Sequence, residues 1–350
     1  MNVKSIYCNH IHITKMFDNS LFDKFDSEKM HEVYDKWPEI SEEAYNSNYD
    51  LIHYCNISHI VFAGMGGSGA ISDIFYSVLS KAKIHVTVVK GYLLPNTVDE
   101  NTLVVTISIS GNTKETLTVL DSARKLNCKI VSFCSGGEML EYCKKYGIKY
   151  RKIPMIHSPR ASFTLFLYAM LKVLEPVLPI NREKIKESIE NMKQLRDKIS
   201  SSNTTNNPSL DLANWISGIP LIYYPWGLQA AAIRFKNSLQ ENSKCHVISE
   251  DMIEACHNGI VGWEKSSYVQ PILIEGADDY SKTKQRWIIL KKLFVSKKID
   301  FKEIKSVNGG ILSKIINLIY LLDYCSIYLA LIRGIDPSPV DSIDFIKKQL

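Results

Sequence analysis

Short apolar runs alternate with amphipathic stretches over most of the chain. Where a run is rich in β-branched residues and spans four to eight positions, a buried strand is expected, and the longer amphipathic segments between runs suit helices or short crossovers. Strands that alternate with helices in this way favour a parallel sheet with helices on both faces. The strands predicted for the first half are HIVFAG (59–64), IHVTVV (84–89), TLVVTIS (102–108), CKIVSFCS (128–135) and IKYRKIP (148–154).

The same pattern restarts after residue 211. A strand that enters a glycine is followed by the helix LQAAAIRFKNSLQEN (228–242), and a long apolar helix begins near Ile311. The strands predicted here are PLIYYPWG (220–227), KCHVISE (244–250), YVQPILIEG (268–276) and IDFKEIKSV (299–307). Two related α/β units in tandem are the simplest account, so the expected fold class is α/β with two doubly wound parallel-sheet subdomains.

Three segments are expected in the chain. Residues 20–50 predict an amphipathic helix that is broken near Pro38, so residues 1–50 form an N-terminal helical lead. A helical stretch at 160–200 closes the first domain, 51–200. The polar segment SSSNTTNNPSLD (200–211) is the best linker candidate, and the second domain is 201–350 with a C-terminal helix.

Composition excludes several classes. The chain has 350 residues, is 45% hydrophobic and 23% charged, and has scattered cysteines without a CxxC pair or a Cys/His cluster, so we expect no metal site and a reducing cytoplasm. The net charge of +5 is mild and the lysines are dispersed, which does not indicate a nucleic-acid partner. The opening MNVKSIYCNHIH does not resemble a signal peptide.

The two most apolar segments are FTLFLYAML (163–171) and IINLIYLLDYCSIYLALI (315–332). The first is too short to cross a bilayer and the second carries Asp323. We therefore expect buried core helices and no membrane partner.

The segment VFAGMGGSGA (61–70) contains GxGxxG, the glycine pattern of dinucleotide sites. A dinucleotide site also needs an acidic residue about 20 residues later, at the end of the next strand, to bind the ribose. That strand, IHVTVVK, ends in Lys90. The dinucleotide interpretation lacks its partner residue, which leaves a tight strand-to-helix turn or a different ligand.

A second polar turn follows the third strand, in TLVVTISISGNTKETL (102–117). Hydroxyl and amide side chains gather there at the carboxyl end of a strand, before a helix whose free N–H groups attract anions. The alternative is a helix cap in a Ser/Thr-rich loop. The predicted phosphate-binding residues, taken from this turn and the glycine turn, are Gly67, Ser68, Ser108, Ser110 and Thr113.

At this point the chain resembles a known family. The pair GMGGSG and SxSGNTxET is similar to the sugar isomerase (SIS) domain, which binds phosphosugars. Three further motifs resemble the archaeal-type bifunctional phosphoglucose/phosphomannose isomerases, which have two SIS domains in one chain: RFKNSLQENSK (234–244), EACHNGIVGW (254–263) and DPSPVDSIDFIKK (336–348). The resemblance runs from about residue 55 to the end.

The resemblance implies an aldose–ketose isomerase that interconverts glucose 6-phosphate, and mannose 6-phosphate, with fructose 6-phosphate through a cis-enediol, without cofactor or metal. It implies that Glu241 is the base on the C2 and C1 protons. It assigns ring opening to His257, reaching the neighbouring subunit's site in a homodimer. It also implies that Lys347 is the active-site lysine, with Lys348 as the alternative, and that Arg160 steadies the enediolate.

Each of these residues also has an ordinary structural interpretation: a surface glutamate, a loop histidine, a solvated lysine pair or a turn arginine. A phosphosugar-sensing SIS regulator is the non-catalytic alternative, and a single-activity SIS isomerase would lack the joint pattern. The polar stretch near 200–208, the long lead and Ile109 depart from the usual family pattern.

Overall fold

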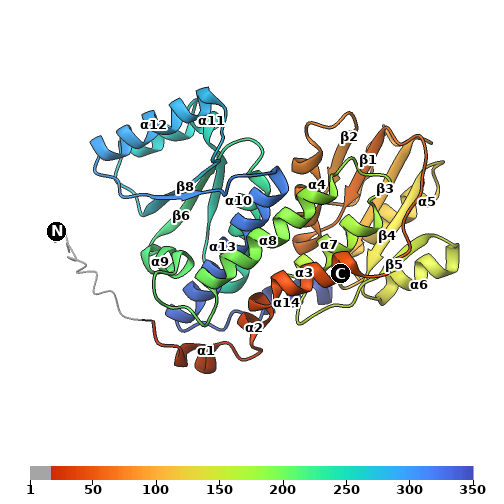
Figure 1. Ribbon diagram of the computed structural model, residues 1–350, viewed down its shortest axis with the longest axis horizontal. Coiled ribbons are helices and arrows are strands. Elements are labelled where there is room, and N and C mark those ends of the chain that lie inside the picture. The colour runs from red at the N-terminus through yellow and green to blue at the C-terminus, as the bar shows by residue number, and fades with distance from the viewer. Residues whose placement is uncertain (1–16, 350) are drawn as a thin grey trace.

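Two parallel sheets organise the computed structural model, which describes residues 17–349 (Figure 1). The first has the strand order β2-β1-β3-β4-β5 and the second the order β7-β6-β8-β9. Their bounds are β1 His59–Ala63, β2 His85–Val89, β3 Thr102–Ser108, β4 Lys129–Cys134, β5 Lys149–Lys152, β6 Ile219–Tyr224, β7 Ile248–Asp251, β8 Val269–Glu275 and β9 Lys302–Lys305. Both units place their strands in the order second, first, third, fourth, which confirms two α/β units of one topology.

Helices cover both faces of each sheet. Successive side chains of a strand point to opposite faces, so each strand packs on helices on both sides. In β1, Phe62 stacks on Phe75 of α4 (Gly66–Leu79) at 4.6 Å, whereas Val61 joins a cluster with Val119 of α5 (Lys114–Arg124). The second sheet repeats this arrangement with α10 (Gln229–Ser243) on one face and α12 (Ser281–Ser296) on the other. The doubly wound architecture is confirmed.

The boundary between α10 and β7 differs from the sequence prediction. The strand was expected from residue 244, but β7 begins at Ile248. Lys244 ends α10 in the left-handed conformation, with φ of 54°, and the chain needs the next residues to turn back toward the sheet.

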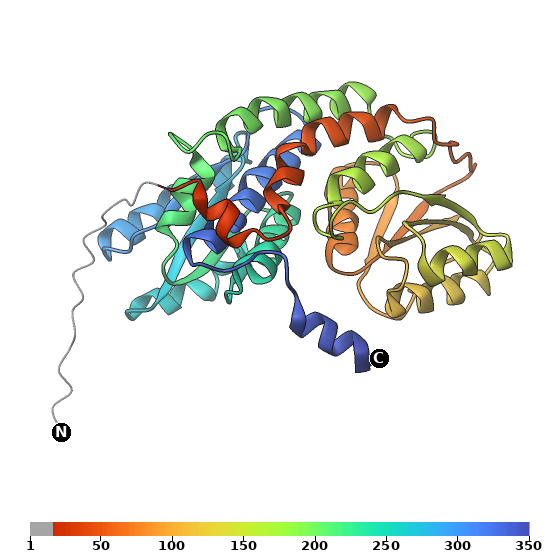
Figure 2. The same cartoon turned by 90° about the horizontal axis from the view of Figure 1, so that it is seen from below.

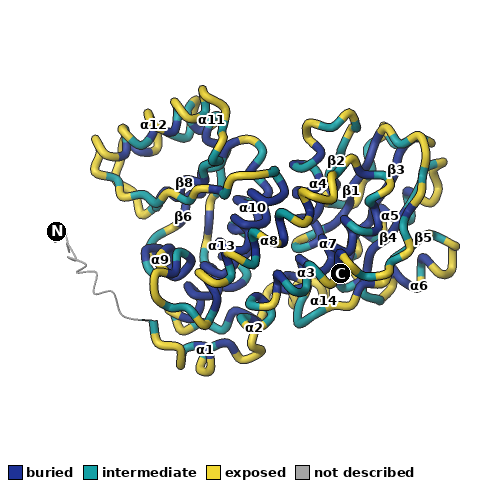
Figure 3. The backbone as a smooth tube through the Cα atoms, viewed as in Figure 1, coloured by how far each residue is buried: buried dark blue, intermediate teal, exposed yellow. Residues whose placement is uncertain are grey.

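A layer of helices joins the two sheets. It contains α7 (Phe163–Val173), α8 (Arg182–Ile199), α9 (Pro208–Trp215) and α13 (Ile311–Ile332). Within the described residues, α13 alone has the length and hydropathy of a membrane span, yet 94% of its most apolar window is buried inside the protein. Figure 3 shows the helix buried along its length. The expectation that the two apolar segments form core helices is confirmed.

From residue 17 onward, the N-terminal lead forms three helices, α1 (Ser20–Phe25), α2 (Met30–Asp35) and α3 (Trp37–Asn46). The expected break near Pro38 is confirmed: it falls at Lys36, and Pro38 lies in the first turn of α3, where a missing N–H costs nothing. Residues before 17 lie outside the described part of the chain. The lead packs on α13, with Trp37 and Tyr320 stacked at 5.5 Å.

The last helix, α14 (Asp341–Gln349), stands apart from the body of the molecule (Figure 2). All of its described side chains are exposed, including Phe345 and Ile346. The remaining helices are α6 (Gly137–Tyr146), which follows β4, and the short α11 (Met252–Ala255) and η1 (Gly259–Glu264), which follow β7.

A buried ion pair joins α10 to α13. Arg234 donates to Asp323 from Nε and Nη2, at 2.9 and 2.7 Å, and Ser238 donates to the other carboxylate oxygen at 2.5 Å. The side chains of Arg234 and Asp323 are 4% and 0% exposed. Burial by itself lowers the pKa of Arg234, but the charge of Asp323 and the other nearby groups raise it above its usual value, so the arginine stays charged in the core.

Replacing one partner of this pair should be costly, because it leaves an uncompensated charge in the core. We expect Asp323→Ala to lower the free energy of unfolding by about 3–5 kcal/mol, measured by urea denaturation. Asp211→Ala, at an exposed position of α9, is the matched control and should change it by less than about 0.5 kcal/mol. Equal effects of the two substitutions would contradict a structural role for the pair.

Candidate active site

The carboxyl ends of β1 and β3 meet at the first sheet's topological switch point, because the chain leaves β1 and β3 on opposite sides. The glycine turn after β1 leads directly into α4, whose first residue, Gly66, has φ of 52°. The polar turn after β3 leads into α5, whose N-cap is Thr113. Both predicted turns therefore lie side by side at one sheet edge, each at a helix N-terminus.

Ser108 organises the polar turn. Its buried hydroxyl accepts from the N–H groups of Gly111, at 3.1 Å, and Thr113, at 3.4 Å, and lies 2.9 Å from the Thr113 hydroxyl. Ser68 reaches the same turn and accepts from the N–H of Ile109 at 3.3 Å. The structure thus brings the predicted residues of both turns together.

Exposure separates these hydroxyls into two groups. Ser68 and Ser108 are buried, whereas Ser110 and Thr113 are only partly buried. Gly111 is required here: its φ is 78°, and a Cβ would lie 1.8 Å from the carbonyl oxygen of Gly136.

Lys90 occupies the position where a dinucleotide site carries an acid. It forms an ion pair of 2.5 Å with Asp73 of α4, and burial raises the pKa of that carboxyl despite the lysine. A cation that is already paired with a helix side chain cannot bind ribose hydroxyls as a carboxylate does. Lys90, whose presence argues against a dinucleotide site, therefore has a structural role at this edge of the sheet.

The loop before α7 brings Arg160 beside the glycine turn. A Cβ on Gly67 would lie 3.4 Å from the carbonyl oxygen of Pro159 and 3.8 Å from the Cα of Arg160. A Cβ there would make ordinary van der Waals contacts, so the loop packs directly beside the glycine turn.

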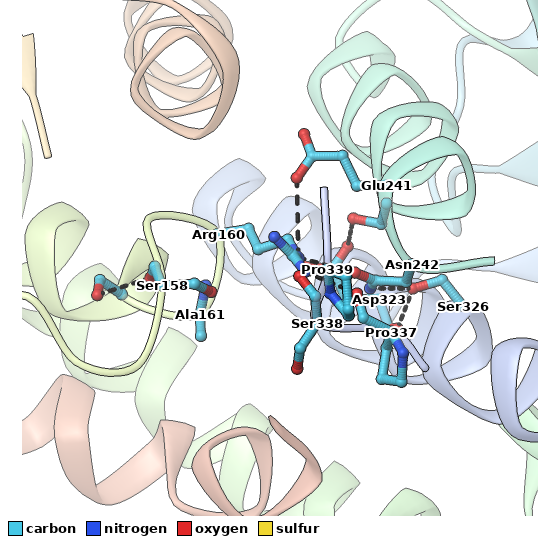
Figure 4. A network of polar contacts seen from close by, with 12 residues as sticks. Ser158, Arg160, Ala161, Glu241, Asn242, Asp323, Ser326, Pro337, Ser338 and Pro339 are labelled. Atoms are coloured by element: carbon cyan, nitrogen blue, oxygen red, sulfur yellow. Dashed lines mark hydrogen bonds and ion pairs between the residues drawn. The ribbon is translucent and has the colours of Figure 1, made fainter. Parts of the chain in front are cut away.

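The Arg160 guanidinium is held by neutral oxygens (Figure 4). Nη2 donates to the carbonyls of Pro337 and Ser338, both at 2.7 Å, and Nε donates to Oδ1 of Asn242 at 2.8 Å. The arginine side chain is only 7% exposed. Because its five donors have a fixed fork geometry, these bonds set the plane and direction of the charge.

Glu241 is the anion nearest to that charge. Its Oε2 lies 3.8 Å from Arg160 Nε, and its side chain is 25% exposed. It lies in the last turn of α10, and Figure 4 shows its carboxylate directed away from the helix toward Arg160. At this separation the carboxylate keeps oxygen lone pairs free to accept a proton, while the arginine provides a cation that cannot itself act as an acid.

Asn242 and Lys244 are site residues to which sequence reasoning gave no role, although both stand in the motif RFKNSLQENSK. Asn242 is buried, and its amide also donates to the hydroxyl of Ser326 at 2.8 Å. Lys244 donates to the carbonyl of Pro339 at 2.7 Å. Burial and the charge of Arg160 lower the pKa of Lys244. In the sequence, only their positions next to Glu241 in this motif could have indicated that they belong to the site.

Ser338 is a further residue that the sequence did not single out. It is buried beside Arg160, and its hydroxyl oxygen has no hydrogen-bond partner among residues 17–349. A buried hydroxyl without a partner is uncommon in proteins.

His257 lies away from the Arg160–Glu241 pair. It follows β7 and is exposed, at the carboxyl edge of the second sheet. The parallel strand β6 ends at that edge and leads into the start of α10, so Glu241, twelve residues along α10 from Gln229, is displaced from it by roughly 18 Å of helix. The contact between Tyr76 of α4 and Trp226, at 6.2 Å, places that edge near the far end of α4 from the glycine turn.

Lys347 and Lys348 lie on the exposed α14. Within the described chain, no hydrogen bond or ion pair joins either lysine to Arg160 or Glu241. The structure of a single chain therefore brings together Arg160, Glu241 and the two turns of the first sheet, and it does not bring His257 or the lysines to them.

Residues 17–349 contain no group of three or more His, Cys, Asp or Glu side chains arranged to hold a metal ion. The carbonyl and amide oxygens around Arg160 accept hydrogen bonds from cationic side chains. It is the charge of Arg160, and not these oxygens, that suits an anionic ligand.

Comparison with known proteins identifies both halves. Residues 53–157 match the SIS domain, and residues 205–350 match the bacterial phospho-glucose isomerase C-terminal SIS domain. Together with the parallel sheets, these matches confirm the expected fold class.

Two relatives that match over most of their length share one name. The chain is 32% identical to the bifunctional phosphoglucose/phosphomannose isomerase of Caldicellulosiruptor bescii, over 89% of this chain and 96% of that protein. It is 31% identical to that of Aquifex aeolicus, over 83% and 90%. Among solved structures it is similar in fold to the C-terminal domain of glucosamine-fructose-6-phosphate aminotransferase from Francisella tularensis, with a TM-score of 0.64, 17% identity and coverage of 88% and 96%.

The two turns should bind inorganic phosphate. We expect phosphate at 100 times its Kd to stabilise the protein by about 2.7 kcal/mol, seen as a rise in the thermal unfolding midpoint. Ser110→Ala and Thr113→Val should reduce this rise, because each removes a hydroxyl at the anion. Thr118→Val, an exposed threonine on α5, is the matched control. A phosphate response that is the same in all four proteins would contradict an anion site here.

Proposed function

The chain belongs to the bifunctional phosphoglucose/phosphomannose isomerase family, and we propose from this premise that it interconverts glucose 6-phosphate and mannose 6-phosphate with fructose 6-phosphate through a cis-enediol. The observation that carries the proposal is the position of the Arg160–Glu241 pair, at 3.8 Å, beside the turns suited to a phosphate.

The phosphate and the reacting carbons lie at opposite ends of the substrate. The phosphate binds at the N-termini of α4 and α5, on Gly67, Ser68, Ser110 and Thr113, with Ser108 holding the turn. Since Gly67 adjoins Arg160, the sugar then extends from the turns toward Glu241. Holding the substrate by its unreactive end orients C1 and C2 at the base.

Glu241 transfers the proton. Its carboxylate removes the proton from C2 of the aldose, and the electrons move to the C1 carbonyl oxygen to give an enediolate. The proton of the C2 hydroxyl passes to the C1 oxygen, and the same carboxyl returns its proton to C1, which leaves the C2 carbonyl and C1 hydroxyl of the ketose. Negative charge develops on the oxygens of C1 and C2 during this transfer. Arg160, fixed by three neutral acceptors, stabilises that charge without becoming a proton donor.

Ring opening requires a separate acid and base. His257 suits this step because imidazole titrates near neutral pH. In one chain it lies at the edge of the second sheet away from Glu241, so we propose that the partner subunit of a homodimer supplies it. Lys347 on α14, with Lys348 as the alternative, acts with His257 at the end of the sugar that carries C1 and C2.

A sensing role without catalysis is the alternative function. A sensor would need the phosphate turns but no base, and a buried arginine beside a partly exposed carboxylate has no purpose in recognising a phosphate. The proton transfers proposed here need neither metal nor nicotinamide. We also propose that the protein acts in the cytoplasm, on a small sugar phosphate alone.

Glu241→Gln should abolish exchange of the C2 proton with solvent while leaving sugar-phosphate binding nearly intact, because the amide keeps the shape but accepts no proton. Exchange is measured by NMR in deuterated water and binding by calorimetry. Glu190→Gln, an exposed carboxylate on α8, is the control and should leave both unchanged. C2 exchange by Glu241→Gln at close to the normal rate would show that another residue is the base.

Glu241→Gln and His257→Ala should each be nearly inactive alone and should complement one another. After equal amounts are unfolded and refolded together, random pairing makes half of the dimers mixed, and each mixed dimer holds one intact site, so roughly a quarter of normal activity should return. No recovery, or full activity from a protein that light scattering shows to be monomeric, would exclude the shared site.

A further inference from the structure

The turn between α1 and α2 contacts the segment that holds Arg160. The Ser27 hydroxyl donates to Oδ2 of Asp336 at 2.5 Å, and Oδ1 of the same carboxylate accepts from the N–H of Ser338 at 2.9 Å. Asp336 therefore has one oxygen on the N-terminal lead and the other on the backbone of its own segment. This pairing fixes the backbone from Asp336 to Ser338.

That backbone supplies two of the three acceptors of Arg160, the carbonyls of Pro337 and Ser338. A continuous set of hydrogen bonds thus runs from Ser27 through Asp336 to the guanidinium. Arg160 Nε and Glu241 Oε2 are 3.8 Å apart, which is too far for a hydrogen bond, so Glu241 does not hold the guanidinium in place. The position of the carbonyls decides how close the cation stands to the base.

The lead also holds the other side of Arg160. The indole N–H of the fully buried Trp37 donates to the carbonyl of Ala161, the next residue, at 2.9 Å. Glu28 lies 3.6 Å from His157, three residues before Arg160. Farther along, Phe25 lies against Gly334, where an added Cβ would be 3.3 Å from its ring. The lead therefore contacts both loops that meet at the arginine.

We propose that Ser27 is a positioning residue for the isomerase reaction: through Asp336 it sets the carbonyls that hold Arg160 at its distance from Glu241. The inference rests on the proposed function. Without the Ser27 bond, Asp336 loses one of its two restraints and the carbonyls gain freedom. The guanidinium can then move onto Glu241, forming a closer ion pair that makes the carboxylate a weaker base.

This role is separable from folding, because Ser27 is exposed and has little apolar surface to bury. Loss of a single exposed hydrogen bond should change stability little. A displacement of a positioned charge, by contrast, acts on the rate of the chemical step, where misplacement by 1 Å can cost up to about 100-fold. We accordingly expect kcat for Ser27→Ala to fall roughly five- to twentyfold, with KM for fructose 6-phosphate within about twofold of normal.

The test compares four variants of the full chain. Ser27→Thr keeps a hydroxyl and should restore kcat. Ser20→Ala is the matched control, because that serine also donates to an exposed aspartate, Asp18, at 2.6 Å, but lies within α1. Asp336→Asn weakens the same contact from the other side. In a double-mutant cycle with Ser27→Ala, it should therefore give a smaller loss than the product of the single losses.

Each outcome decides the inference. A kcat loss confined to Ser27→Ala and Asp336→Asn, with thermal midpoints equal to that of Ser20→Ala and rescue by Ser27→Thr, supports it. Normal kcat in Ser27→Ala overturns it, and so does a kcat loss that tracks a lowered midpoint. If the unmodified protein does not isomerise fructose 6-phosphate, the proposed function is wrong. That result is distinguishable from failure of the inference, in which the unmodified protein is active and Ser27→Ala has normal kcat.

Discussion

The buried ion pair between Arg234 and Asp323 is the interaction on which the arrangement of the site depends. Besides joining α10 to α13, Arg234 donates from Nη2 to the carbonyl of Arg160 at 2.9 Å, and the hydroxyl of Tyr34 lies 3.4 Å from the carboxylate. The arginine also stacks on Phe163, with its Cζ 4.5 Å from the ring centre. Helices from the lead, the first unit and the second unit thus meet at one desolvated ion pair. Displacing either partner would leave an uncompensated buried charge and lower the stability of the fold.

Arg234 and Arg160 have different roles because their hydrogen-bond partners differ in charge. Arg234 is neutralised by a carboxylate at 2.7 Å and serves as a fixed donor in the core. Arg160 is surrounded by carbonyl and amide oxygens, which orient its charge without cancelling it. An uncancelled cation that is held in place is available to an anion that develops during a reaction, which is the requirement for electrostatic catalysis.

The site is built at a junction of the two units. The first sheet provides two helix N-termini at its switch point, and the second provides the carboxyl-terminal turn of α10 with Glu241. Neither unit holds both the turns and the carboxylate. The proximity of Gly67 to the loop that holds Arg160 brings the two sets together.

The sequence by itself determined the strands, the two glycine- and serine-rich turns, the core helices and the motifs around Glu241, because these depend on local periodicity, on backbone freedom at glycine and on residues near in sequence. It misplaced the start of β7, since Lys244 ends α10 in a left-handed cap and the strand begins only at Ile248. Tertiary structure alone decided that Arg160 is held by residues 337 and 338 and that Ser27 reaches Asp336, 309 positions away. It also decided that His257 and Glu241, only sixteen residues apart, lie at opposite edges of a sheet. Such contacts follow from how packed layers bring distant segments together, which no local pattern records.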